Sequence, residues 1–186
     1  NTRDRPYIVM EGLVDSELEM SEGHAPKEKV ILYSGGLYER YGLKKFIDAF
    51  LSLDHPELTL HLYGSGPLEE YILDAARDKR NLEFKGTLSN NQLVKKQQEA
   101  WLLVNPRPTD ELLTLYSFPG KNMEYMVSGV PTLTTNLAGM PEEYKKYVFI
   151  LEDETKEGIE TALMDITLIS DEHLRMKGLA AREFVK

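Results

Sequence analysis

The segment 116–131 brings together a lysine, a glutamate and an expected helix start. Pro119 is expected to open a helix that ends at Gly129, with Lys121 in the first turn and Glu124 one turn later. A lysine near the positive end of a helix dipole favours a bound anion, and a glutamate there can accept hydrogen bonds from sugar hydroxyls. The spacing therefore indicates phosphate and sugar recognition; the alternative is a solvated surface ion pair between Lys121 and Glu124.

Glycine-rich loops follow several expected strands. They contain Gly35 and Gly36, then Gly64, Ser65 and Gly66, then Gly86 and Thr87, and finally Gly139. Glycine lets backbone N–H groups approach a ligand closely, and the helix N-termini that follow favour phosphate. A single glycine pair also ends strands for steric reasons, so the prediction rests on several loops meeting at one edge of a sheet.

Two common phosphate-binding motifs and the usual metal motifs are missing from the sequence. Neither a P-loop nor Gly-x-Gly-x-x-Gly occurs, because Gly66 is followed by Pro67. The four histidines are scattered, and His61 is interpreted as a core or edge residue of a strand. A P-loop ATPase, an ordinary dinucleotide dehydrogenase and a zinc site are therefore disfavoured, and no metal ligand is predicted.

Composition and charge narrow the class further. The 186 residues carry 22 Lys and Arg against 31 Asp and Glu, a net charge of -9, which disfavours general attraction to nucleic acid or an anionic bilayer. There is no cysteine, and no apolar run approaches the roughly 20 residues that cross a membrane. A reducing compartment is compatible with this composition.

From residue 30 onward, short apolar runs alternate with stretches of helical period, which predicts an α/β fold. Strands are expected at 30–34, 58–63, 82–85, 101–105, 131–135 and 147–151. A capping box at Ser89 and Gln92 opens one of the intervening helices, and two amphipathic helices follow the last strand. The expected fold is a Rossmann-like parallel sheet of about six strands with helices on both faces.

Residues 1–29 differ from the rest in composition. Residues 7–10 could form a short strand, but 15–29 are polar, acidic and without period, so 1–29 are interpreted as a linker or edge segment from an interdomain region. Residues 30–186 form the expected domain. The sequence opens without an initiator methionine, which is typical of a piece of a longer protein.

Five motifs, taken in order, resemble the C-terminal nucleotide-sugar-binding domain of a family 4 (group 1) retaining glycosyltransferase with the GT-B fold. They are YSGGLYERYG at 33–42, LYGSGP at 62–67, FKGTL at 84–88, FPGKNMEYMVSGVP at 118–131 and NLAGMPE at 136–142. The resemblance covers about residues 30–150. It implies sugar transfer from a nucleoside diphosphate sugar, with a UDP-sugar favoured, and no obligatory metal or other cofactor.

The resemblance also implies partners and a location. The acceptor would be a glycan or a lipid-linked glycan, held by an N-terminal acceptor-binding domain outside this sequence. Nucleic acid is not an expected partner. Polysaccharide assembly in the cytoplasm is implied, at the inner face of the plasma membrane, with any peripheral membrane contact made through the missing domain.

Residue roles follow from the same resemblance. Glu124 stands where the family binds the ribose hydroxyls, and Tyr116 stands eight residues earlier, where the family has a glutamate near the transferred sugar. Gly36 and Tyr41 occupy the places of two cations that neutralise the diphosphate. Lys121 is the expected replacement. Arg40, one residue from the second cation's place, and Arg107 are further candidates, and Ser117, Phe118, Pro119 and Gly120 complete the expected donor site.

Three other interpretations remain open at this point. A flavodoxin-like or receiver-like signalling domain also alternates strands and helices. A catalytically degenerate domain that only binds a nucleotide or a partner would account for Gly36, Tyr41 and Tyr116. A UDP-sugar epimerase of the same two-domain architecture is the alternative enzyme, disfavoured by the block at 118–131.

Overall fold

Six short apolar segments pair into one parallel sheet. The computed structural model describes residues 18, 26, 28–110 and 120–186. The strands are β1 (Lys29–Ser34), β2 (Leu58–Tyr63), β3 (Leu82–Gly86), β4 (Leu102–Asn105), β5 (Thr132–Thr135) and β6 (Phe149–Leu151). The order is β3-β2-β1-β4-β5-β6, and every neighbouring pair is parallel. The predicted six-stranded parallel sheet is confirmed.

The strand order shows where a ligand crevice is expected, and it excludes a flavodoxin-like or receiver-like domain. The chain adds strands on one side of β1 up to β3 and then returns to add β4 on the other side. The reversal point lies between the carboxyl ends of β1 and β4, where open α/β sheets bind ligands. A flavodoxin-like or receiver-like domain has a different order, 2-1-3-4-5, so that interpretation is wrong.

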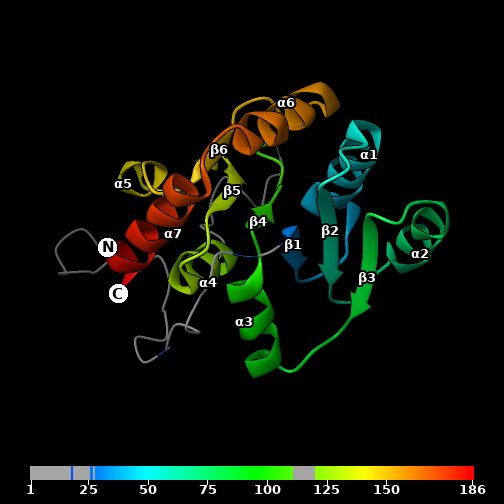
Figure 1. The fold of residues 1–186 in the computed structure, drawn as a ribbon, viewed down its shortest axis with the longest axis horizontal. Helices are drawn as coiled ribbons and strands as arrows, with labels where there is room; N and C mark the ends of the chain where they lie inside the picture. The colour runs from blue at the N-terminus through cyan, green and yellow to red at the C-terminus, as the bar shows by residue number, and fades with distance from the viewer. Residues whose placement is uncertain (1–17, 19–25, 27, 111–119) are drawn as a thin grey trace, which may run out of the picture.

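Helices cover both faces of the sheet, as predicted. The longer ones are α1 (Leu43–Leu53), α2 (Glu69–Asp78), α3 (Asn90–Glu99), α4 (Gly120–Ser128), α6 (Lys156–Thr167) and α7 (Asp171–Val185). Helices α1, α2 and α6 share a buried apolar core with one face. Helices α3 and α4 cover the other, and α7 packs on α4. Figure 1 shows α1 beside α6 at the top of the view and α3 with α4 below.

Local signals in the sequence explain several helix ends. The predicted capping box at Ser89 and Gln92 is present and opens α3. Gly129, with φ 79°, ends α4 in the left-handed conformation that glycine adopts without strain. Two short elements were not predicted, η1 (Glu39–Tyr41) and α5 (Glu142–Lys145). Each covers only about one helical turn, so no repeated apolar spacing signals it.

The last strand is shorter than predicted. Residues 147 and 148 belong to a helical turn that continues α5, because Tyr147 N donates to Tyr144 O at 3.0 Å and Val148 N donates to Lys145 O at 3.4 Å. Those amides are unavailable to the strand ladder. The sheet therefore admits this segment only from Phe149.

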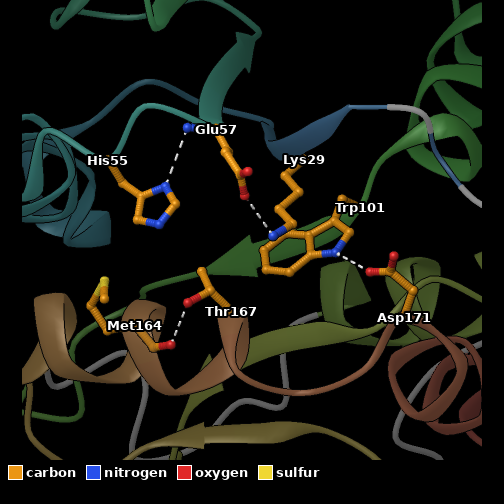
Figure 2. Close-up of polar contacts among 7 residues, drawn as sticks. All are labelled: Lys29, His55, Glu57, Trp101, Met164, Thr167 and Asp171. Atoms are coloured by element: carbon orange, nitrogen blue, oxygen red, sulfur yellow. Dashed lines mark hydrogen bonds and ion pairs between the residues drawn. The ribbon is translucent and has the colours of Figure 1, made fainter.

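The amino ends of the strands form a network of paired polar groups around Trp101 (Figure 2). The indole N–H of Trp101 donates to Asp171 Oδ1 at 3.3 Å, and Lys29 Nζ lies 6.0 Å from the indole ring centroid. Lys29 also forms an ion pair with Glu57 at 2.9 Å. The starts of β1, β4 and α7 are thus joined through a tryptophan that is only 4% exposed.

Helix α7 links this amino edge to α4. It begins at Asp171 beside Trp101, and further along, a Cβ atom at Gly178 would stand 2.2 Å from Gly129 O. Only glycine permits such close contact with the turn that ends α4. The Arg182 guanidinium donates to Val127 O, a carbonyl of the last turn of α4. Helix α7 therefore holds the C-terminal end of α4 in place.

Candidate functional site

A small cavity lies beyond the carboxyl ends of β1, β2 and β3. Its volume is about 190 Å³, and its lining comprises Gly35, Gly36, Tyr63, Gly64, Ser65, Thr87, Leu88 and Leu93. Five of the predicted donor-site residues therefore share one cavity. Gly86 adjoins it, because its carbonyl accepts the amide of Gly64 at 2.8 Å.

Gly64 is required by close approach and by conformation, and Gly35 is required by conformation and lies next to the lysine of α4. Gly64 has φ 135°, and a Cβ atom there would stand 1.8 Å from Gly35 O. Gly35 has φ 142°, and a Cβ atom there would stand 2.3 Å from Lys121 Nζ. The second loop therefore makes room for the carbonyl of Gly35, and the first loop leaves space for the lysine of α4.

The amides of Gly35, Gly64 and Gly66 already have acceptors within the protein. Gly35 N donates to Tyr63 O at 2.9 Å, Gly64 N to Gly86 O at 2.8 Å, and Gly66 N to Glu69 Oε1 at 2.8 Å. The first two bonds extend the hydrogen-bond ladder of the sheet into the loops, and the third joins the second loop to the first turn of α2. These three glycines therefore contribute space rather than free amide donors, whereas ligand binding by the other loop residues stays a prediction.

Lys121 lies in the first turn of α4 and reaches back to the end of β1. Its ammonium donates to Ser34 O and lies 5.3 Å from the ring centroid of Tyr33 and 5.6 Å from that of Tyr125. No carboxylate of a described residue forms an ion pair with it, so the alternative of a surface pair with Glu124 is wrong.

The charge of Lys121 is poorly compensated. Burial lowers the pKa of this ammonium, Glu124 partly offsets that effect, and nearby Arg107 lowers the pKa further. The positive end of the α4 dipole adds to the same field. The protonated lysine would be stabilised by an anion at this position.

Arg107 is a second cation at the carboxyl end of β4. Its guanidinium carbon lies 5.0 Å from the ring centroid of Tyr41, and its buried Nε has no hydrogen-bond partner in the described part of the chain. Arg40 is exposed, lies over Tyr38 and Tyr41 at 4.9 and 5.3 Å, and does not line the cavity. Of the two arginine candidates, Arg107 is the one that electrostatically couples to Lys121.

A hydrogen-bond network connects α3, α4 and the end of β1. Gln97 Nε2 donates to Glu124 Oε1 and, at 3.1 Å, to Ser34 Oγ. The Tyr125 hydroxyl accepts from Ser34 N at 2.9 Å and bonds Ser34 Oγ at 3.1 Å. Sequence reasoning missed Gln97. Its signal was a polar residue four positions after Leu93, on the apolar side of α3.

A second buried polar group lies under the start of α4. Asn105 Nδ2, at the end of β4, donates to Asn122 Oδ1 at 2.7 Å. Asn122 Nδ2 and the hydroxyl of neighbouring Thr134 are buried without a partner among the residues that the structure describes. Sequence reasoning did not single out these residues, because asparagines near a strand end and a helix start are common.

Several predicted site residues lie outside the described part of the chain. They are Tyr116, Ser117, Phe118 and Pro119. Gly120 is described; it is exposed and is the first residue of α4. The described residues contain no group of three or more His, Asp or Glu side chains placed to hold a metal ion. Among them, no helix is long and apolar enough to span a membrane.

Comparison with known proteins identifies relatives of the whole domain. The family described as glycosyl transferases group 1 matches residues 15–182. A search of curated proteins finds no match. Solved structures with a similar fold share 16–20% identity, which shows the fold and no more.

Three of these structures illustrate the likeness. A mutant of TarM from S. aureus, in complex with fondaparinux, alpha-GlcNAc-glycerol and UDP, has a TM-score of 0.76 at 16% identity over 97% of this chain. Sucrose-phosphate synthase from Thermosynechococcus elongatus has a TM-score of 0.69 at 20% identity over 86% of this chain. The pneumococcal O-GlcNAc transferase GtfA, in complex with UDP and GlcNAc, has a TM-score of 0.67 at 18% identity over 92% of this chain. The chain spans 36%, 41% and 35% of their respective lengths.

Proposed function

The chain belongs to the group 1 glycosyltransferase family, and on that premise we propose that residues 30–186 are the donor-binding domain of a retaining, family 4 glycosyltransferase. The donor is a nucleoside diphosphate sugar, and the acceptor is a glycan or glycolipid held by an N-terminal domain. Two similar structures contain UDP, which favours a UDP-sugar. The observation that carries the proposal is the pairing of two cations at the reversal point of the sheet.

The diphosphate is proposed to lie between the start of α4 and the loop after β4. Lys121 and Arg107 meet there without a carboxylate partner among the described residues, in a protein whose net charge is -9. A local pair of cations in an acidic protein favours one compact anion over an extended polyanion. Arg107 thereby supplies positive charge beside Tyr41, which stands at a place where the family has a cation.

The nucleoside is proposed to extend from these cations toward the glycine-lined cavity. Glu124 lies one turn after Lys121, so its carboxylate can accept hydrogen bonds from the ribose hydroxyls. The cavity of about 190 Å³ lies beyond the ends of β1, β2 and β3, where it can receive the base. Gly36, Ser65 and Thr87 then surround the base, and Gly86 shapes the cavity floor.

Catalysis in this proposal depends mainly on charge. The bond between the anomeric carbon and the diphosphate oxygen breaks, and its electron pair remains on the diphosphate. The acceptor hydroxyl oxygen bonds to that carbon and gives up its proton to the departing diphosphate. Lys121, Arg107 and the α4 dipole stabilise the developing negative charge. Tyr116 is proposed to hydrogen-bond the transferred sugar, and Ser117 to Gly120 to border the phosphates. Polysaccharide assembly at the cytoplasmic face of a membrane is the proposed setting.

The proposal is tested by calorimetric titration of the protein with UDP, GDP, ADP and uridine. We expect selective binding of one diphosphate, with UDP favoured, and loss of that binding in Glu124→Ala. Failure of all three diphosphates to bind, in the full-length protein as well as in this domain, would contradict the proposal.

Lys121→Ala separates phosphate recognition from nucleoside recognition. The affinity for UDP is expected to fall more than tenfold, because a charge-assisted contact is lost, while uridine binding changes little. An equal loss for UDP and uridine would show that Lys121 does not contact the phosphates.

A second candidate is a domain that binds the nucleotide without catalysing transfer. Gly36 and Tyr41, at the places of the family's two cations, favour it. A transfer assay with radiolabelled UDP-sugars on the full-length protein distinguishes the two, since only the enzyme consumes donor in the presence of acceptor.

A further inference from the structure

We infer that Gln97 is a positioning residue for nucleotide binding: its buried amide fixes the carboxylate of Glu124 so that the ribose hydroxyls meet an oriented acceptor. This inference rests on the ribose role proposed for Glu124. Gln97 lies on α3, does not line the glycine-rich cavity and acts only through its neighbours.

The contacts of Gln97 leave one orientation for its amide. The side chain is 0% exposed, and the two N–H bonds of Nε2 point to Glu124 Oε1 and Ser34 Oγ. Rotation of the amide by half a turn would place its carbonyl oxygen against the carboxylate, acceptor against acceptor. The acceptor oxygen of Glu124 therefore selects the observed orientation, and the amide in turn restrains the side chain of Glu124.

The amide oxygen of Gln97 shows that a glutamine at this position does not give the greatest stability. Gln97 Oε1 is buried without a hydrogen-bond partner in the described part of the chain. A buried carbonyl without a partner is unfavourable, and an apolar side chain of similar length would avoid that cost. Ser34 Oγ would keep a partner, since it also bonds the Tyr125 hydroxyl at 3.1 Å.

The same network relates the two proposed ligand contacts to a single residue. Lys121 Nζ donates to Ser34 O, while Ser34 Oγ accepts the amide that holds Glu124. The end of β1 therefore sets the position of the phosphate cation and of the ribose acceptor together. A change at Gln97 is expected to disturb the ribose contact and spare the phosphate contact.

The test compares UDP with 2′,3′-dideoxy-UDP in the unchanged protein and in Gln97→Met. Methionine keeps the length of the side chain and removes both N–H donors. The unchanged protein is expected to prefer UDP, and Gln97→Met to bind UDP about tenfold more weakly, the value of one charge-assisted hydrogen bond. Binding of dideoxy-UDP should stay within about twofold, and the melting temperature should not fall. Lys95→Met, on the exposed side of α3, is the control for placing methionine in this helix.

Gln97→Glu adds a pH readout that a purely structural role would not give. Two adjacent carboxylates share one proton at low pH, and that proton supplies the missing donor. The UDP affinity of this variant is expected to approach that of the unchanged protein at acidic pH and to fall as the pH rises.

The outcomes separate this inference from the proposed function. Equal affinity of the unchanged protein for UDP and dideoxy-UDP would overturn the ribose role of Glu124 and the inference with it. If the unchanged protein prefers UDP and Gln97→Met keeps the full preference, the inference alone is wrong. A pH-independent Gln97→Glu variant would also overturn it.

Discussion

Within the described residues, polar side chains at one end of the sheet have hydrogen-bond or ion-pair partners, whereas several at the other end lack them. At the amino end, Lys29, Trp101 and Asp171 have partners at 2.9–3.3 Å (Figure 2). At the carboxyl end, Lys121 and Arg107 have no carboxylate ion-pair partner among the residues that the structure describes. The buried side-chain atoms without any hydrogen-bond partner in the described part of the chain also lie at or near this end, in Gln97, Arg107, Asn122 and Thr134.

This difference separates two tasks within one domain. Paired groups at the amino end stabilise the fold, because each buried donor finds an acceptor. Unpaired buried groups at the carboxyl end cost stability, and the uncompensated charge of Lys121 becomes favourable when an anionic ligand binds. Substitutions at the amino end should therefore change stability, and those at the carboxyl end should change binding.

Trp101→Ala should give the largest effect and should act on stability. Removal of this buried indole is expected to lower the free energy of unfolding by about 3–5 kcal/mol, measured by urea unfolding. The affinity of the folded protein for UDP, measured well below the unfolding transition, should stay within about twofold. Trp101→Phe keeps an aromatic ring at this position, so its free energy of unfolding should lie between those of the unchanged protein and Trp101→Ala. A large loss of affinity in Trp101→Phe would show that the two ends are not separable.

Arg107→Met, at the carboxyl end, should change UDP affinity and leave stability nearly unchanged. The affinity for UDP is expected to fall about tenfold through loss of a charged contact. Stability should be unchanged or slightly higher, because a buried unsatisfied Nε is removed. Arg40→Met is the matched control and should bind UDP within about twofold of the unchanged protein. A larger effect for Arg40→Met than for Arg107→Met would exchange the roles of the two arginines.

Asp171→Ala tests a single contact at the amino end. Loss of the acceptor for the Trp101 indole is expected to cost about 1 kcal/mol, with UDP affinity unchanged. Glu172→Ala removes the neighbouring charge from the first turn of α7 without that contact and should cost less. Equal losses in the two variants would assign the effect to the helix dipole rather than to the indole.

The smallest expected effect is a pair of opposed pH slopes at Lys121. Burial lowers the pKa of this lysine below its ordinary value of 10.5, so between those two values the unfolded chain binds more protons than the folded chain. The contribution of Lys121 to the free energy of unfolding therefore rises with pH in that window, whereas the UDP affinity falls as the ammonium loses its charge.

The measurement is the difference between the unchanged protein and Lys121→Met, by urea unfolding and by titration at each pH. Methionine should abolish both slopes. Slopes of the same sign would contradict the placement of a charged lysine against a bound anion.

Most of the fold was predictable because its signals are local. The strands end at glycines or polar residues, and the capping box at Ser89 and the glycine at 129 fix helix ends through contacts within a few residues. The shortened β6 was not predictable, because it depends on a helical turn that uses the amides of residues 147 and 148.

The site was predictable in position and less so in chemistry. The glycine loops gather at one edge, as parallel strands require. The amides of Gly35 and Gly64 are used by carbonyls at the ends of neighbouring strands, and that depends on pairing between segments about 30 residues apart, as in the bond from Gly35 N to Tyr63 O. Gln97 was missed for the same reason, because its partners come from β1 and α4.

Helix α7 gives the region of the site a distant anchor. It contacts the turn after α4 through Gly178, holds Val127 O through Arg182, and begins beside Trp101. Helix α4 should therefore unfold locally only when α7 detaches. In native-state hydrogen exchange, the slowest amides of α4 and α7 should exchange through one shared opening, with the same dependence on denaturant. The rigidity of α4, the helix that carries Lys121 and Glu124, would then depend on the contacts that α7 makes with Trp101 at the amino end of the sheet.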